Sequence, residues 1–314
     1  VEYIVQKAKG LAINIHPLGA ISKKTAGTDL SEMYDMQQSG AIAFSDGIHP
    51  VQSAGLVLKA LQYVKSFEGT IIQLPDDTSI GANGLMNEGI ISTQMGLPGK
   101  PILAEELMVA RDLKLARYAN SKIHFTGISS PKSIEYIKRS KESGIQVTCS
   151  ITPYQVYFCD EDLQGYDTNL KLNPPLRTRA DMVAIQKALL DGTIDCIASH
   201  HLPHHWDNKV CEFEYARHGM IALETMFAVL MSCGLPAKDF VQMQTINVRN
   251  IFGLSIPEIK EGETASLTLF VPGAAFTYEE TMIRSKSKNS PFIGKKLTGK
   301  VVGIINKSNI HLNN

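Results

Sequence analysis

Four histidines stand close together in the second half of the chain, and imidazole is a common ligand for metal ions. An apolar run from Ile194 to Ala198 is followed by His200, His201, His204 and His205. A zinc ion held by imidazoles lowers the pKa of a bound water from ~16 to about 7 and creates a nucleophile at neutral pH. The cluster therefore suggests metal-assisted hydrolysis. Ligands so closely spaced on a tight loop rarely converge on one ion, so an ordinary loop of solvated or hydrogen-bonded histidines is the alternative.

Other polar side chains follow apolar runs and have two interpretations each. Asp46 suits a metal ligand or an acid/base, or a carboxylate that caps a turn. Asp76 and Asp77 form an acid/base pair or a solvated turn, since adjacent carboxylates can raise one pKa. Arg177 can hold an anion through two hydrogen bonds, and His124, inside a strand-like run, suits a buried hydrogen bond.

These residues need strands and helices to position them, and the first 257 residues show an alternating pattern of both. Such alternation predicts parallel strands joined by crossover helices, with chemistry at the carboxyl ends of the strands. We count about six such units, where a closed (β/α)₈ barrel has eight strands. The expected strands are 41–44, 70–74, 123–126, 145–151 and 195–198, and the expected helices include 51–66, 132–143 and 218–232.

The pattern changes near Glu258. Residues 263–271 and 299–305 have the character of antiparallel strands, so we predict a barrel-like domain at 1–257 and part of a small β-domain at 258–314. The chain opens with Val1 and a strand-like run to Val5, and not with Met. We therefore expect an upstream segment of the natural product, or another chain, to cover the strand edges that an incomplete barrel leaves unpaired.

The composition narrows the class of partner. Lys plus Arg equals Asp plus Glu at 31 each, which gives no basic surface for nucleic acid or an anionic membrane. No apolar run approaches the ~20 residues that span a bilayer. The five cysteines include no CxxC pair, as is typical of reduced cysteines, so we expect a cytoplasmic protein with a small-molecule or protein partner.

Several blocks, in order and spacing, resemble dihydroorotase, the cyclic amidohydrolase of pyrimidine synthesis, especially its long bacterial type. The resemblance covers about residues 19–307. The blocks are Gly19-Ala-Ile-Ser22, Gly40-Ala-Ile-Ala-Phe-Ser-Asp-Gly47, Met86-Asn-Glu-Gly89, Val147-Thr-Cys149, Thr152-Pro153, Asn173-Pro-Pro-Leu-Arg177, Asp191-Gly-Thr-Ile-Asp195, Leu223-Glu-Thr225 and Ser287-Lys-Asn-Ser-Pro-Phe292.

The resemblance implies a TIM-like barrel with a small β-sandwich, and one or two zinc ions. The family's first ligand pair, His-x-His, would lie upstream of Val1. The bridging aspartate of the family matches Asp46, whereas the later ligands match Gln73, Gly127 and, at the catalytic aspartate, His200. The resemblance therefore implies a dismantled zinc site with one retained ligand position.

The substrate-binding positions are better preserved. Asn173 and His204 match the family's residues for the substrate ring, and Arg177 is a candidate for an anionic group. A small cyclic amide or carboxylate is the ligand that these positions imply.

Three functions remain open. The first is a catalytically inactive dihydroorotase homologue that holds no cofactor and acts as a scaffold, with aspartate carbamoyltransferase or a second copy of itself as the partner that the resemblance implies. The second is an active zinc-dependent dihydroorotase or related cyclic amidohydrolase, with His200 or His204 as general base. The third is a regulator that binds a small carboxylate through Asn173, Arg177 and His204 without chemistry.

Overall fold

A parallel sheet runs through the larger part of the computed structural model, which describes residues 1–313. Its strands are β1 (Thr70–Gln73), β4 (Lys122–Phe125), β5 (Val147–Ile151) and β6 (Cys196–Ile197), and they lie in the order β1-β4-β5-β6. Single parallel bridges join Phe44 to Ile71 and Gly19 to Phe44, so two more segments extend the sheet beyond β1. The spatial order follows the chain order, as successive βα units require.

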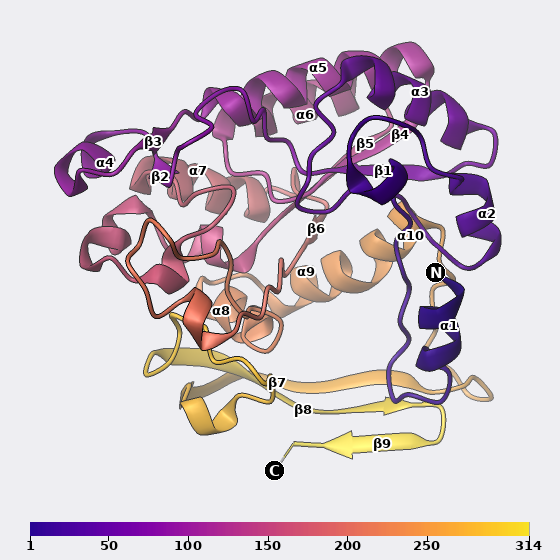
Figure 1. Cartoon of the computed structure of the whole chain (residues 1–314). Coiled ribbons are helices and arrows are strands. Elements are labelled where there is room, and N and C mark those ends of the chain that lie inside the picture. Colours follow the sequence, from indigo (N-terminus) through magenta and orange to yellow (C-terminus); the bar gives the residue numbers. More distant parts are fainter. Residues whose placement is uncertain (314) are drawn as a thin grey trace.

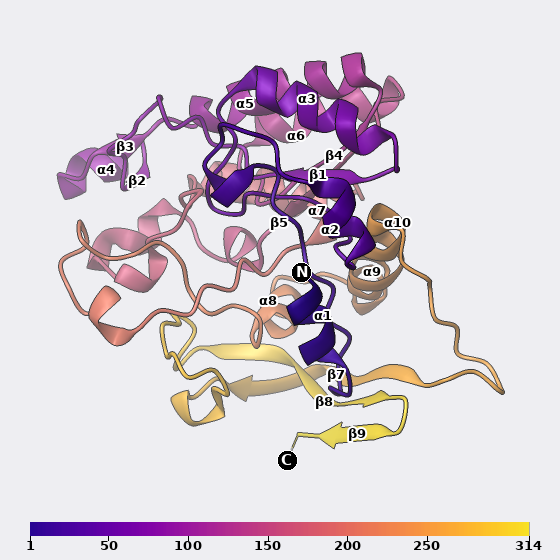
Figure 2. The same cartoon turned by 45° about the vertical axis from the view of Figure 1, so that its right-hand side comes forward.

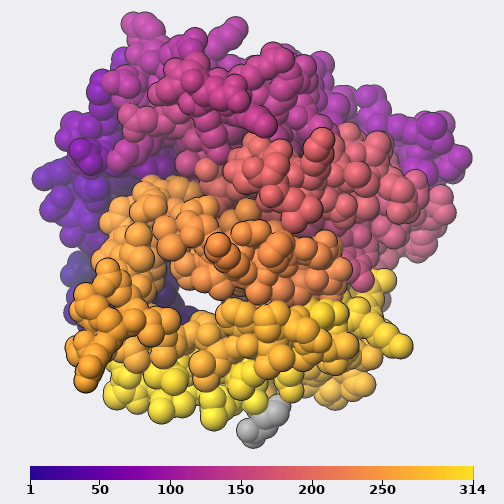
Figure 3. Space-filling view, turned by 180° about the vertical axis from the view of Figure 1, so that it is seen from behind, coloured from indigo at the N-terminus to yellow at the C-terminus, as the bar shows by residue number. Residues whose placement is uncertain are grey.

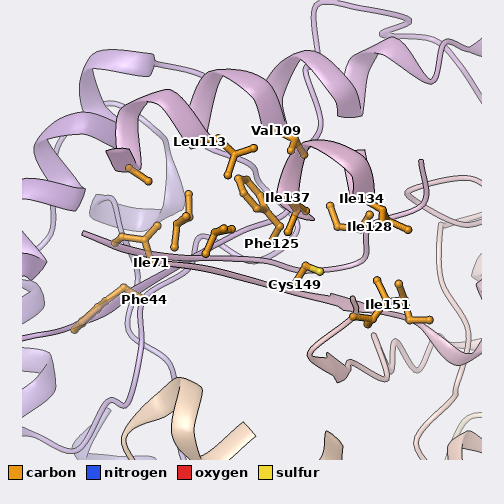
Figure 4. Close-up of a cluster of buried hydrophobic side chains, with 14 of the residues drawn as sticks. Phe44, Ile71, Val109, Leu113, Phe125, Ile128, Ile134, Ile137, Cys149 and Ile151 are labelled. Atoms are coloured by element: carbon orange, nitrogen blue, oxygen red, sulfur yellow. The ribbon is translucent and has the colours of Figure 1, made fainter. Parts of the chain in front are cut away.

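Helices cover the outer face of this sheet and bury its apolar side chains. Their bounds are α3 (Ala54–Lys65), α5 (Leu103–Ala119), α6 (Pro131–Glu142) and α7 (Arg179–Leu190). Figure 1 shows α3, α5 and α6 as one layer over the strands. In the core between the layers, Phe125 and Cys149 of the strands lie beneath Val109 and Ile137 of the helices (Figure 4). The alternation of strand side chains therefore sends one set into this core and the other set to the opposite face.

Shorter elements complete this part of the chain. The helix α9 (Ala237–Val241), a π-helical segment (Gln242–Asn247) and α10 (Val248–Phe252) follow one another as a continuous rod on the face opposite α3 and α5 (Figure 2). The others are α1 (Glu2–Ala8), α2 (Met33–Gln38), β2 (Met86–Asn87), α4 (Ile90–Met95), β3 (Gly99–Lys100) and α8 (Met226–Ser232).

A second, antiparallel sheet lies apart from the first. It consists of β7 (Ser266–Thr277), β8 (Lys296–Asn306) and β9 (Asn309–Leu312), in that order. The rear view shows a hollow between these strands and the segment around residues 240–260 (Figure 3). The helix α8 joins the two parts, because Phe227 of α8 packs against Phe270 of β7. The domain boundary at residue 258 stays a prediction.

The strands expected at 70–74, 123–126, 145–151 and 195–198 and most expected helices are present, but three segments differ. The strand expected at 41–44 is reduced to isolated bridges at Phe44. The run Val1 to Val5 is helical: the amides of Ile4 and Val5 donate to the carbonyl of Val1, and the run pairs with no strand of residues 1–313. The helix expected from residue 218 begins at Met226. The residues before Met226 are not helical, and Met220 forms a parallel β-bridge with His201.

No helix in the part of the chain that the structure describes is both long and apolar enough to cross a membrane. All five cysteines are free thiols.

Candidate functional site

A cavity of about 410 Å³ lies toward the carboxyl ends of the parallel strands. Its apolar walls include Ile72 of β1, Leu74 directly after β1, Tyr154, and Phe252 of α10. Its polar lining includes His200. Among the described residues that line it, none is Asp, Glu, Lys or Arg. The cavity therefore has an apolar body and a short uncharged polar wall.

Gln73 does not face this cavity. Since Ile72 and Leu74 line it, strand alternation directs Gln73 into the helix layer. Its Nε2 donates to the carbonyl of Val51 at 3.2 Å and to Oδ2 of Asp112 at 3.3 Å. Gln73, which the resemblance matches to a family histidine, thus uses its side-chain amide in hydrogen bonds with α5 and with the backbone of Val51.

Asp46 is buried, and its oxygens are used by a neighbouring loop. Its Oδ1 accepts hydrogen bonds from the amides of Ile21 at 2.8 Å and Ser22 at 3.0 Å, and its Oδ2 accepts from the Ser22 hydroxyl. A carboxylate held by two amides and a hydroxyl stabilises the loop that contains them. This geometry corresponds to the capping interpretation.

The side chain of His200 lies directly beside the backbone of Gly127. Gly127 has a positive φ of 71°, and a Cβ built on it would lie 2.5 Å from Cε1 of His200. The Nε2 atom of His200 lies 2.8 Å from Oγ1 of Thr126. The imidazole of His200 therefore fills the volume that a side chain at position 127 would need, and it is held there by a hydrogen bond.

The polar wall is a chain of hydrogen bonds across three strand ends. His124 contacts Thr148 through Nδ1 at 2.8 Å and Ser150 through Nε2 at 3.1 Å. Ser150 in turn lies 3.1 Å from Thr126, which contacts His200. Burial lowers the pKa of His124 to about 3 and that of His200 to about 4, so both rings are neutral at pH 7.

The remaining histidines of the loop diverge. Nδ1 of His201 accepts from the amide of Ala222 at 3.2 Å, and Nε2 of His204 donates to the carbonyl of His218 at 2.8 Å. His205 is exposed to solvent. No group of three or more His, Cys, Asp or Glu side chains among residues 1–313 is placed to hold a metal ion. The histidines of this loop therefore do not converge on one point within the described part of the chain.

Asn173 belongs to a polar triad near the cavity. Nζ of Lys100 lies 2.6 Å from Oδ2 of Asp76 and 3.0 Å from Oδ1 of Asn173, and Nδ2 of Asn173 donates to Asp76 at 3.0 Å. Asp76 is buried, so the solvated turn proposed for it is wrong. Asp77 is partly exposed and accepts hydrogen bonds from Ser79, which lower its pKa. Sequence gave no signal for Lys100, because the ion pair joins distant segments.

Arg177 is only 4% exposed and is committed to internal contacts. Its Nε donates to Oγ of Ser129 at 2.9 Å, its Nη1 donates to Asn87 at 3.0 Å, and its Nη2 lies 3.5 Å from Glu105. The guanidinium therefore stabilises the junction of α5 with β2 and with the loop after β4, and Arg177 is not among the residues that line the cavity.

A parallel sheet covered by helices, with a cavity at the strand ends and an appended antiparallel sheet, defines an amidohydrolase-type α/β protein. The model for the amidohydrolase family matches residues 80–310, and the dihydro-orotase-like model matches residues 2–133. The chain is 41% identical to the dihydroorotase of Geotalea daltonii, over 95% of this chain and 71% of the relative. It is 39% identical to that of Syntrophus aciditrophicus, over 96% and 72%. The chain belongs to the dihydroorotase family.

Solved structures agree with the predicted TIM-barrel amidohydrolase fold. An L-hydantoinase (dihydropyrimidinase) from Arthrobacter aurescens superimposes with a TM-score of 0.84 at 20% identity, over 97% of this chain and 72% of that one. A D-hydantoinase superimposes with a TM-score of 0.80 at 17% identity, over 99% and 73%. These likenesses concern the fold alone.

Proposed function

We propose that this chain is a dihydroorotase homologue without hydrolytic activity, whose role in pyrimidine biosynthesis is structural. The observation that carries the proposal is the space beside Gly127, where the family has a metal-binding histidine and this chain has the ring of His200. Two further positions support it, because Asp46 is held by a loop and Gln73 by the helix layer.

The remaining groups are weak substitutes for a metal centre. A general base alone contributes ~10²–10⁴-fold, whereas enzymes reach ~10⁶-fold or more. His200 is neutral at pH 7 and could accept a proton, but its Nε2 is already engaged by Thr126. Low or absent turnover follows from this chemistry.

The test measures zinc and turnover on one sample of protein from the complete gene, purified without chelator. Zinc is determined by elemental analysis and dihydroorotate hydrolysis by absorbance, with the Geotalea daltonii dihydroorotase prepared in parallel as the active control. We expect well under one zinc per chain and no hydrolysis. Near-stoichiometric zinc with turnover would overturn the proposal and establish an active zinc-dependent dihydroorotase.

A structural role requires a partner, and an exposed loop beside the histidines offers a contact surface. Trp206, Val210 and Tyr215 are 65%, 71% and 74% exposed. Large aromatic side chains dominate the binding energy of many protein interfaces. We propose aspartate carbamoyltransferase as the partner, on the basis of the family resemblance.

Analytical ultracentrifugation of the two proteins from the same organism tests this part separately. We expect a complex that is lost in Trp206→Ala/Tyr215→Ala but kept in Tyr118→Ala, since Tyr118 is 77% exposed on a different element, α5. A mixture that sediments as two separate species would refute the partner while leaving the loss of hydrolysis untouched.

A further inference from the structure

The cavity carries no formal charge on its described lining, which restricts the ligands it can hold. Lys100, which hydrogen-bonds to the lining residue Asn173, is already paired with Asp76. The buried Arg177 is paired with Glu105. A carboxylate that entered the cavity would lose water without gaining a counter-charge, and burial of an unpaired charge is strongly unfavourable. The small carboxylate expected from the sequence is therefore a poor match for this cavity.

The hydrogen-bond chain on the polar wall engages both ring nitrogens of His124 and one of His200. Nδ1 and Nε2 of His124 lie within hydrogen-bond distance of Thr148 and Ser150, and Ser150 also contacts Thr126. Because a hydroxyl group can both donate and accept, and a neutral imidazole has two tautomers, the chain can run in either direction.

One ring nitrogen of His200 is not used by this chain of hydrogen bonds. Nε2 of His200 lies 2.8 Å from Oγ1 of Thr126. Nδ1 has no hydrogen-bond partner in residues 1–313, and it is not among the buried atoms that lack one. Since His200 lines the cavity, its Nδ1 is available to a ligand, as a donor or as an acceptor according to the tautomer.

The rest of the wall is apolar, with Ile72, Leu172 and Phe252 among its residues. A volume of about 410 Å³ lies in the range of small-molecule sites, ~300–1,000 Å³. We infer that the cavity binds an uncharged, largely apolar small molecule with an amide-type group that hydrogen-bonds to Nδ1 of His200. The inference rests on the proposed function in one respect, namely that the polar wall is a hydrogen-bond chain and not a metal centre.

Two probes of matched shape test the charge preference on the unaltered protein from the complete gene. The uncharged probe is 2-naphthamide and the anionic probe is 2-naphthoate, each titrated by isothermal calorimetry. We expect 2-naphthamide to bind at least tenfold more tightly. Equal or tighter binding of 2-naphthoate would overturn the inference; together with metal-free, inactive protein, that result would leave the proposed function standing.

Variants test where 2-naphthamide binds and whether it forms a hydrogen bond with His200. Ala198→Phe fills the cavity and should abolish binding of 2-naphthamide, while Ala60→Gly, in the helix layer away from the cavity, should leave it within about twofold. His200→Phe keeps a ring beside Gly127 but removes both ring nitrogens. It should weaken 2-naphthamide about tenfold and leave naphthalene, which has no hydrogen-bonding group, nearly unchanged. An equal effect of His200→Phe on both compounds would refute the assigned hydrogen bond, and circular dichroism checks the fold of each variant.

Discussion

Gly127 and His200 show how one pair of residues can determine the chemistry of a cavity. Gly127→Ala adds a Cβ at positive φ, which costs about 1–2 kcal/mol, and forces it against the His200 ring, which costs about 1–3 kcal/mol more. We expect urea unfolding to show a loss of about 2–5 kcal/mol in the free energy of unfolding. In a His200→Ala background the same change should cost only about 1–2 kcal/mol.

Gly192→Ala is the matched control for backbone strain. Gly192 has a φ of 77°, but a Cβ there meets no atom within 4 Å. Its cost should be about 1 kcal/mol. Equal losses for Gly127→Ala and Gly192→Ala would contradict the tight contact with His200.

Buried neutral histidines also make stability depend on pH. The pKa of His124 is about 3 in the folded state against about 6.5 unfolded, first because of burial and then because of Lys141 and His200. Between these values the unfolded chain binds one more proton, so the contribution of His124 is complete above pH 6.5 and declines as pH falls. The slope approaches about 1.4 kcal/mol per pH unit.

Denaturant unfolding at pH 7.5, 6, 5 and 4.5 measures this effect. His124→Gln should lose stability less steeply with acid than the unaltered protein. His200 and His218, whose pKa values are each about 4, act in the same direction in both proteins. Parallel pH profiles for the two proteins would show that His124 is not buried as the structure has it.

For individual residues, the sequence predicts which positions correspond to the site but not which contacts they make. The resemblance matched Gln73 and Gly127 to ligand positions of the family from residue types and spacing alone. The direction of Gln73 toward Asp112, and the filling of the space at Gly127 by His200, depend on packing between segments distant in the chain. No local pattern encodes such contacts.

At the edge strand β6, backbone carbonyl groups accept hydrogen bonds from side-chain amides and not from a neighbouring strand. Nδ2 of Asn247 donates to the carbonyl of Asp195 at 2.8 Å, and Nε2 of Gln244 donates to that of Ile197 at 2.9 Å. Both amides belong to the π-helical segment Gln242–Asn247. This rod therefore supplies two hydrogen bonds that a neighbouring strand would otherwise provide.

Removing one amide should expose that dependence. Asn247→Leu keeps the side-chain volume but leaves the carbonyl of Asp195 without its donor, so we expect a loss of about 1–3 kcal/mol in urea unfolding. Asn250→Leu makes the same substitution at an exposed position on α10 and should change stability by under about 0.5 kcal/mol. A similar loss in both variants would argue against a specific role for the amide.

Periodicity predicted the long elements well and the short ones poorly. The helix expected at 51–66 and the strand expected at 123–126 are present as α3 and β4. The run Val1 to Val5 has β-branched character yet is helical, because a strand needs a partner and this segment has none in residues 1–313. Local helical hydrogen bonds satisfy its backbone, so the intrinsic preference of the β-branched residues for a strand has no effect here.

For the whole molecule, the antiparallel sheet depends on a close approach between β8 and α8. Gly299 has a φ of 103°, and a Cβ there would lie 2.8 Å from Cγ of Met231 and 3.1 Å from Cε1 of Phe227. Gly299→Ala should therefore destabilise the protein by about 2–4 kcal/mol. Hydrogen exchange should show the loss of protection mainly in β7 to β9, because the substitution separates this sheet from α8.

Gly273→Ala in β7 is the control, since its Cβ meets no atom within 4 Å and its φ is not in the left-handed region. It should leave exchange in β8 unchanged. Uniform loss of protection across both sheets after Gly299→Ala would mean that the two parts unfold as one cooperative unit.

The shared space of Gly127 and His200 also couples the residues that the two positions can accommodate. A histidine at position 127 would collide with the ring of His200, and an aspartate at position 200 would leave a void beside Gly127 and remove the ring that contacts Thr126. Each single substitution therefore damages packing that the other residue completes, so the two are tolerated only together. The pair is thus a point of epistasis, because the effect of a substitution at one position depends on the residue at the other.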